Sequence, residues 1–161
     1  MFLNRSRWRP KATEEELHSL YTVHFKGVLF LTQKLAPLIN RGGAVVFTTS
    51  MANVKGMPNL AAYGPAKAAL RSFARVFAAE LAPRGVRVNA VSPGPIDTPI
   101  AGKSFPNQDM ATQATAQMSE AVPMKRMGTS DEVAKAVLFL AFDATFTTGA
   151  ELPVDGGWSQ L

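Results

Sequence analysis

The sequence predicts an α/β fold with a parallel sheet of about three strands, flanked by long helices. Segments with apolar residues at helical spacing alternate with short apolar runs along the chain, which is typical of parallel strands joined by crossover helices. The short runs are rich in β-branched residues, as strands buried on both faces are. The absence of repeats and low-complexity stretches favours one compact unit.

The first helix is expected over residues 13–40. Thr13 followed by Glu16 matches a capping box, and apolar residues then recur at helical spacing as far as Leu38. Gly42 and Gly43 break this helix. Because they stand at a helix end and before a strand, we interpret them as a C-cap and not as a phosphate-binding turn.

A buried strand follows at residues 44–49 (AVVFTT) and a second long helix at residues 61–82. The alanines of this helix permit close packing against another helix, and the run Pro83-Arg84-Gly85 ends it. The next strand is expected at residues 86–91 (VRVNAV).

The last part of the chain predicts one more helix and one more strand. Residues 99–128 are polar and weakly periodic, and indicate a mobile segment with a helical piece. Ser130, with Glu132 after it, opens a third clear helix that runs to about Phe142. A short strand at residues 151–154 (ELPV) closes the fold.

Composition excludes several classes of protein. The chain has 161 residues, of which 47% are hydrophobic, and no cysteine. It therefore has no disulfide framework, no thiolate zinc site and no thiol nucleophile, and we predict no metal site. No apolar run approaches the ~18 residues of a membrane span, and no secretory signal is recognisable. We expect a cytoplasmic protein that does not contact a membrane.

The net charge of +5 is concentrated at the N-terminus. Four basic residues and no acid lie in the first eleven positions, which leaves 13 Lys and Arg against 12 Asp and Glu in the rest of the chain. We interpret residues 1–12 as a basic tail and residues 13–161 as the folded part. A nucleic-acid arm is the weakest interpretation of the tail, because no aromatic residues alternate with basic ones after it. We predict no nucleic-acid partner.

Ser50, Tyr63 and Lys67 form the candidate catalytic group. Ser50 ends a predicted strand, and open parallel sheets bind ligands outside the carboxyl ends of their strands. Tyr63 and Lys67 are four residues apart, so both side chains project from one helix face. A phenol with a pKa near ~10 is a poor acid or base at neutral pH, and a cation beside it lowers that pKa. Ser50 could stabilise charge on the same substrate oxygen.

Several segments resemble the short-chain dehydrogenase/reductase family. In that family a Ser lies thirteen residues before the Tyr of a Tyr-x-x-x-Lys motif, as Ser50 lies before Tyr63. The resemblance continues, in the family's order, through residues 80–98 (ELAPRGVRVNAVSPGPIDT), 126–134 (RMGTSDEVA) and 148–157 (TGAELPVDGG). It extends from about Glu14 to Gly157. The resemblance implies that the parallel strands are part of a doubly wound, Rossmann-like sheet, with residues 13–161 as the C-terminal part of an NAD(P)-binding domain.

The resemblance also implies roles for individual residues. Tyr63 would be the general acid and base, and Lys67 would support it and hold the nicotinamide ribose. Ser50 would orient the substrate. His24 stands where the family often has an Asn that supports a water relay, so it is either a relay residue or a histidine packed on the inner face of its helix.

The segment Pro93-Gly94-Pro95-Ile96-Asp97-Thr98 is similar to the loop that the family places beside the nicotinamide. Pro93 and Gly94 belong to this cofactor-binding loop. Ile96 would meet the carboxamide through its backbone, and Thr98 would approach the diphosphate. The reaction implied is hydride transfer between a carbonyl/alcohol pair and NAD or NADP.

The family's Gly-rich turn, Thr-Gly-x-x-x-Gly-x-Gly, which holds the cofactor diphosphate, does not occur in this sequence. We therefore expect the catalytic half of an oxidoreductase without its dinucleotide-binding half. Two hypotheses follow: an NAD(P)-dependent oxidoreductase acting on a small carbonyl or alcohol, or a catalytically silent fragment that serves as an oligomerisation or interaction subunit. In either case the helices at 13–40 and 61–82 are expected to form a homo-oligomer.

Overall fold

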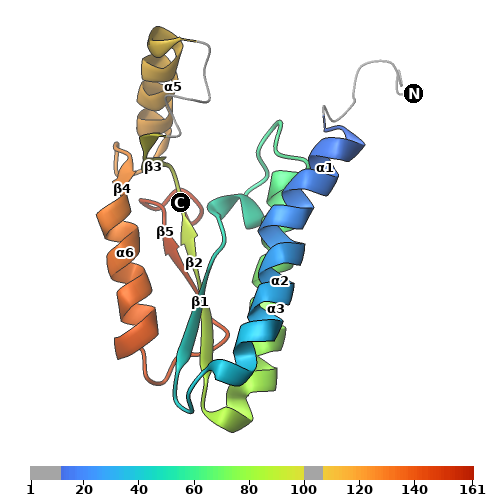
Figure 1. Cartoon of the computed structure of the whole chain (residues 1–161). Helices are drawn as coiled ribbons and strands as arrows, with labels where there is room; N and C mark the ends of the chain where they lie inside the picture. Colours follow the sequence, from blue (N-terminus) through green and yellow to red (C-terminus); the bar gives the residue numbers. More distant parts are fainter. Residues whose placement is uncertain (1–11, 100–106) are drawn as a thin grey trace, which may run out of the picture.

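Parallel strands form the centre of the protein. The computed structural model describes residues 12–99 and 107–161. Its main sheet has the order β1-β2-β5, with both pairs parallel. The strands are β1 (Ala44–Thr48), β2 (Arg87–Pro93) and β5 (Glu151–Val154). These are the three strands that the apolar runs predict, and they form the expected part of a doubly wound sheet (Figure 1).

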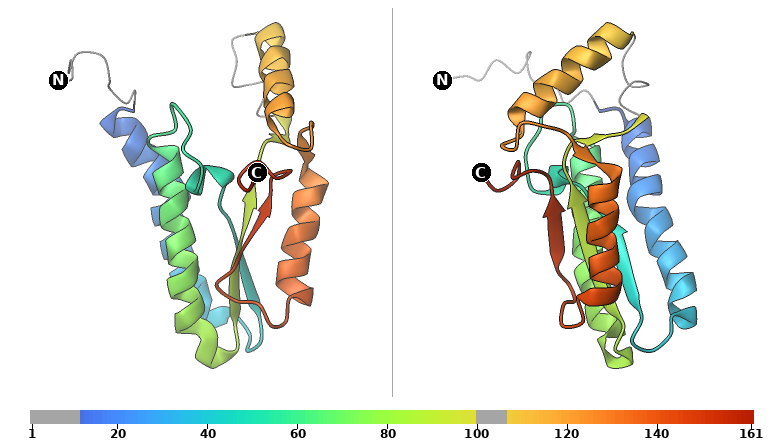
Figure 2. Two further views of the ribbon diagram at one scale, coloured as in Figure 1. Left: turned by 180° about the vertical axis from the view of Figure 1, so that it is seen from behind. Right: turned by 90° about the vertical axis from the view of Figure 1, so that its left-hand side faces the viewer.

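Helices cover both faces of this sheet. On one face lies a rod made of α1 (Glu14–Tyr21), the π-helical segment η1 (Thr22–Lys26), α2 (Gly27–Leu35) and the 3₁₀ segment η2 (Ala36–Leu38). Beside the rod lies α3 (Tyr63–Leu81), which ends in the 3₁₀ segment η4 (Ala82–Arg84). The opposite face carries α6 (Ser130–Leu138) and the π-helical segment η5 (Phe139–Asp143), as Figure 2 shows.

The central strand β2 separates two apolar clusters. Val88 and Ala90 pack with the buried residues Leu70 and Phe77 of α3. Val91 faces the other way and packs with residues of the α6 layer, the buried Leu140 among them. Because neighbouring side chains of a strand point to opposite faces, this alternation buries both sides of β2. It explains why apolar residues occur on both faces of this strand.

The segment before α6 contains more regular structure than the sequence predicts. Within residues 107–128 the structure has a 14-residue helix, α5 (Gln108–Ala121). The short strands β3 (Ile96–Asp97) and β4 (Gly128–Thr129) pair in parallel beyond the carboxyl end of β2. The expected mobility of residues 99–128 remains a prediction, and residues 100–106 lie outside the described part.

Two helix details add to the sequence prediction. Helix α6 begins at Ser130, as predicted, and its N-cap is Thr129, which forms a complete capping box with Glu132. The helix expected at 13–40 contains the π segment, in which the N–H of Gly27 reaches the carbonyl oxygen of Thr22.

Two further expectations concern the N-terminal tail and the membrane. Residues 1–11 of the expected basic tail lie outside the described residues. In the ranges 12–99 and 107–161, no helix is long and apolar enough to cross a membrane.

Candidate active site

Ser50 lies two residues after the end of β1, at the carboxyl end of the sheet. It is the N-cap of the 3₁₀ segment η3 (Met51–Asn53), and its Oγ accepts a hydrogen bond of 3.2 Å from the backbone N–H of Ala52. The side-chain amide of Asn53 donates to the carbonyl oxygen of Ser50 at 2.7 Å. A hydroxyl that accepts one bond still has its own proton to donate. Ser50 can therefore donate to a substrate oxygen from a fixed backbone position.

Tyr63 and Lys67 lie in the first turns of α3. Tyr63 is the first residue of the helix, and the Lys67 Nζ lies 5.7 Å from the centroid of the Tyr63 ring. Lys67 is 7% exposed and donates to the carbonyl oxygen of Thr48, the last residue of β1, at 3.0 Å. The structure thus brings these two residues together at the strand end that leads to Ser50, as their spacing predicts.

The Lys67 ammonium keeps donor capacity for a ligand. Burial lowers the pKa of Lys67 from its ordinary value, because water no longer solvates the charge fully. An ammonium has three N–H donors, and in the described part of the chain it donates to one acceptor, the Thr48 carbonyl. The two remaining donors suit hydroxyl groups such as those of a ribose.

His24 lies against the other side of Tyr63. The two rings meet edge to face, with 5.3 Å between their centroids and 90° between their planes. His24 is half-buried within the π segment η1, a kind of helix distortion that is frequent at functional sites. Burial, and secondarily the charge of Lys67, lower the pKa of His24. The imidazole is therefore neutral at neutral pH, so it can both donate and accept a proton.

Gly64 sets the distance between α3 and the Ser50 turn. A Cβ added at Gly64 would lie 2.9 Å from the carbonyl oxygen of Ala52, which is closer than side chains tolerate. The absence of a side chain therefore lets the turn after Ser50 pack against the first turn of α3. A hollow of about 760 Å³ lies beside this contact, lined chiefly by residues 52–61. Its lining includes Gly64 and Pro65, the two residues after Tyr63, but not Ser50, Tyr63 or Lys67.

The candidate nicotinamide loop begins at the end of β2. The N–H of Gly94 donates to the carbonyl oxygen of Val154 at 3.0 Å, and a Cβ at Gly94 would lie 2.7 Å from the Cα of Asp155. The backbone N–H of Gly94 is thus used inside the protein, and the residue permits β2 and β5 to end close together.

The two residues predicted further along this loop lie at or next to β3. Ile96 pairs with Gly128, whose N–H donates to the carbonyl oxygen of Pro95. In a parallel ladder this bond leaves the N–H and C=O of Ile96 pointing away from β4. Thr98, the next predicted contact, follows β3 directly and is half-buried.

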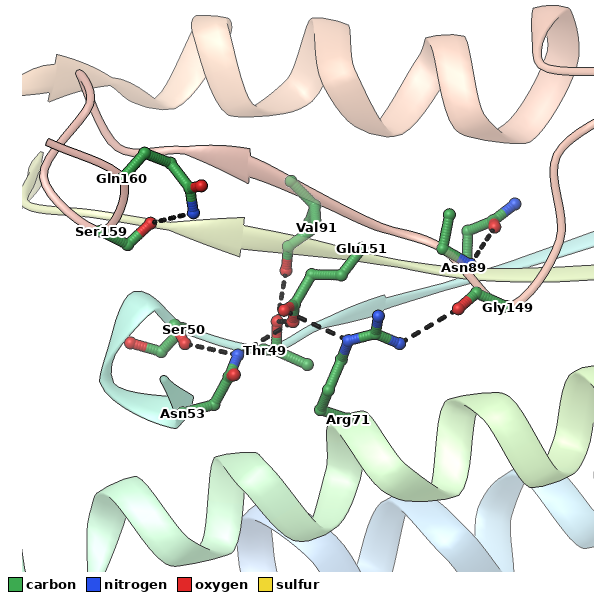
Figure 3. Close-up of polar contacts among 11 residues, drawn as sticks. Thr49, Ser50, Asn53, Arg71, Asn89, Val91, Gly149, Glu151, Ser159 and Gln160 are labelled. Carbon is green, nitrogen blue, oxygen red and sulfur yellow. Dashed lines mark hydrogen bonds and ion pairs between the residues drawn. The ribbon is translucent and has the colours of Figure 1, made fainter. Parts of the chain in front are cut away.

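A buried polar cluster beneath Ser50 was not predicted from the sequence. Glu151, at the start of β5, contacts Arg71 of α3, Thr49 and Asn53 (Figure 3). Thr49 and Asn53 flank Ser50 closely in the chain, and this closeness was the one available signal. The cluster joins the Ser50 turn to a helix and to a second strand.

Comparisons with known proteins agree with this fold. Residues 6–159 match a family model described as enoyl-(acyl carrier protein) reductase. The architecture is that of the nucleotide-binding oxidoreductases with a parallel sheet, and the chain belongs to the short-chain dehydrogenase/reductase family. The resemblance inferred from the motifs is thereby confirmed.

Individual relatives are oxidoreductases. Oxidoreductase asL5 of Sarocladium schorii is 38% identical over 154 residues, which cover 94% of this chain and 60% of that protein. The 3-oxoacyl-(acyl-carrier-protein) reductase of Thermotoga maritima is 35% identical and is matched over 89% of this chain and 57% of its own length. The NADPH-bound short-chain oxidoreductase of Pseudomonas aeruginosa PAO1 superposes with a TM-score of 0.84 at 28% identity, over 93% of this chain and 60% of its own. The chain thus spans about three fifths of the length of these proteins.

Proposed function

We propose that this chain carries the catalytic part of an NAD(P)-dependent oxidoreductase that interconverts a small-molecule carbonyl and its alcohol in the cytoplasm. One observation carries the proposal: the buried Lys67 and Tyr63 project together from α3 at the strand end where Ser50 begins its turn. A nicotinamide cofactor, when bound, supplies the hydride. The chain's own residues supply the proton and the binding of the substrate oxygen.

Each residue of the group has a distinct task in this proposal. The Tyr63 hydroxyl gives its proton to the carbonyl oxygen during reduction and takes it back during oxidation. The Lys67 cation, 5.7 Å from the Tyr63 ring centroid, favours the phenolate that remains. Ser50 donates its hydroxyl proton to the substrate oxygen and stabilises the charge that develops there. His24, neutral and in edge contact with Tyr63, could return a proton through water.

The residues present fit the nicotinamide end of a dinucleotide. Lys67 has two N–H groups left for ribose hydroxyls within the described structure, and the backbone of Ile96 faces away from β4 and is available to a carboxamide. Thr98 lies next along the same loop, while Pro93 and Gly94 shape its entry. The solved structure of the Pseudomonas relative holds NADPH. NAD and NADP are both compatible with these residues.

The test is the reduction of a panel of ketones with NADH or NADPH, measured by the loss of absorbance of the reduced nucleotide. Tyr63→Phe should reduce kcat about 10²–10⁴-fold, the usual contribution of a general acid. Tyr21→Phe is the matched control, because Tyr21 is the other tyrosine of the chain and lies on α1 with its ring against Phe25. Equal rates for Tyr63→Phe and Tyr21→Phe would overturn the proposed role of Tyr63.

A second candidate function rests on an exposed apolar surface. Leu31, Leu35 and Leu38 lie on one face of α2 and η2 and are 60%, 47% and 76% exposed. Large exposed apolar patches mark interaction sites. If the wild-type chain reduces no ketone and binds neither nucleotide, this surface favours the alternative, a catalytically silent subunit that associates through the helices at 13–40 and 61–82.

A further inference from the structure

Glu151 is the centre of a nearly closed polar cluster. Its side chain is 11% exposed and that of Arg71 is 15% exposed, with 3.2 Å between the Arg71 Nε and the Glu151 Oε2. The other carboxylate oxygen, Oε1, lies 2.5 Å from the Thr49 Oγ1 and 2.9 Å from the Asn53 Nδ2. Figure 3 shows Arg71 of α3, Thr49 just after β1 and Asn53 of η3 converging on the Glu151 carboxylate. Three donors on one carboxyl group are the pattern of an ionised carboxylate.

The Thr49 hydroxyl has one proton, and its neighbours decide where that proton goes. Its Oγ1 lies 2.9 Å from the carbonyl oxygen of Val91 and 2.5 Å from Glu151. The Val91 carbonyl already accepts the backbone N–H of Thr49 at 2.8 Å. The hydroxyl therefore donates to the carboxylate, which is the stronger acceptor. Thr49 is thus bonded both to the neighbouring strand β2 and to Glu151.

Asn53 links the backbone of Ser50 to Glu151. Its side-chain amide donates to the carboxylate of Glu151 and to the carbonyl oxygen of Ser50, at 2.9 and 2.7 Å. The residue before Ser50 and the residue three positions after it are therefore bound to the same carboxylate. Arg71 holds that carboxylate from the other side and donates to the carbonyl oxygen of Gly149 at 3.1 Å.

We propose that Glu151, oriented by Arg71, is a positioning residue for Ser50. It fixes the turn of residues 49–53 through Thr49 and Asn53, and so fixes the direction of the Ser50 hydroxyl relative to α3. The catalytic part of this inference rests on the proposed function, because only in that function does Ser50 bind a substrate oxygen. The mechanical part, that the ion pair holds the turn, is independent of any reaction.

A double variant separates this role from a general contribution to stability. Removing one partner of a buried ion pair leaves an unpaired charge, whereas replacing both by apolar residues is often neutral for stability. Arg71→Met with Glu151→Leu should therefore keep a cooperative melting transition. Hydrogen exchange of the peptide that covers residues 49–54 should become at least tenfold faster, while a peptide within residues 74–81 of α3 keeps its protection. Glu120→Gln, which breaks the exposed pair with Lys125, is the control and should change neither peptide.

Two further variants keep the inference testable if the double variant does not fold. Thr49→Val and Asn53→Ala remove the bonds on the turn side and leave the ion pair intact. Each should accelerate exchange in residues 49–54 at least threefold. Glu151→Gln retains an oxygen that can accept from Asn53, so it should lie between the wild type and the double variant. Unchanged exchange of residues 49–54 in folded variants would overturn the proposed positioning role.

The effect of the cluster on catalysis is measured separately from its effect on the rigidity of the turn. In an active wild-type background, Asn53→Ala should lower kcat about tenfold and leave the KM for the nucleotide unchanged, because a misdirected Ser50 affects the reacting oxygen and not cofactor binding. The proposed function is decided by Tyr63→Phe, which leaves the cluster intact. An inactive wild type with faster exchange in the variants would refute the proposed function and support the positioning role. An active wild type whose folded variants show unchanged exchange would support the proposed function and refute the positioning role.

Discussion

The ammonium of Lys67 is charged in a place where water hardly reaches it. The residue is 7% exposed, and its hydrogen bond to the Thr48 carbonyl only partly replaces the lost hydration. Burial therefore lowers its pKa below the 10.5 of a free lysine. The buried charge therefore costs stability, and in the proposed function it supports the adjacent Tyr63.

This burial predicts how stability depends on pH. Between the lowered pKa of folded Lys67 and 10.5, the unfolded chain binds more protons than the folded one, so folding becomes more favourable as the pH rises. Urea midpoints measured from pH 7 to pH 10 should therefore increase for the wild type relative to Lys67→Met. Lys135→Met is the control, because Lys135 is exposed and its pairing with Asp131 raises its pKa. Parallel curves for the wild type and Lys67→Met would contradict the prediction.

At the scale of single residues, what could be predicted depended on separation along the chain. Tyr63 and Lys67 are four residues apart, so helical geometry alone places them on one face. Glu151 bonds Asn53 and Thr49, which lie 98 and 102 positions away in the sequence, and no local pattern encodes such a pairing. Gly94 was interpreted as a cofactor residue from a motif, and the structure shows in addition that its N–H bonds Val154.

At the scale of elements, the contact between α3 and η3 determines how the candidate catalytic group is assembled. The helix carries Tyr63 and Lys67, and Ser50 is the N-cap of η3, so a change in the separation of α3 and η3 moves Ser50 relative to Tyr63. Gly64 is the position of closest approach, with 2.9 Å from its would-be Cβ to the Ala52 carbonyl oxygen. Backbone atoms cannot rotate away as the end of a flexible side chain can.

Gly64→Ala should therefore destabilise the protein. Alanine gains about 0.5–1 kcal/mol over glycine inside a helix, but overpacking against a backbone costs about 1–3 kcal/mol, so we expect a net loss of about 1 kcal/mol in urea denaturation. Gly56→Ala is the matched control, because a Cβ at Gly56 would meet nothing within 4 Å. A Gly64→Ala variant as stable as Gly56→Ala would show that the turn can move without cost.

The elements that could be predicted from the sequence are those whose signal is local. The three strands were predictable because each is a short apolar run bounded by turn residues. The π segments η1 and η5 were not predictable, because a π turn inserts one residue into a helix without changing its composition. The pairing of β3 with β4 was also missed, since strands of two residues have no periodicity.

At the scale of the whole molecule, the exposed apolar residues that the structure describes include two groups on opposite sides of the sheet. One lies on α2 and η2, on the side of the sheet that α3 also covers, and includes Leu31 and Leu38. The other lies on the opposite side and includes Phe142 of η5 and Phe146, which is fully exposed. The helices expected to associate carry the first surface and not the second. The two surfaces can therefore be tested independently by placing a charge on each.

We expect the chain to self-associate through the first surface. The leucines at 31, 35 and 38 lie on one helical face, and burying such a face removes apolar area worth about 25 cal/mol per Å². Light scattering should give a mass at least twice the 17.3 kDa of the chain. The double variant Leu31→Lys with Leu38→Lys should scatter with the mass of one chain, because a lysine buried at the interface without a partner is strongly unfavourable. Phe146→Lys, on the second surface, should leave the larger mass unchanged. If Phe146→Lys alone gives the single mass, the second surface forms the interface, and a wild type that scatters as one chain refutes self-association altogether.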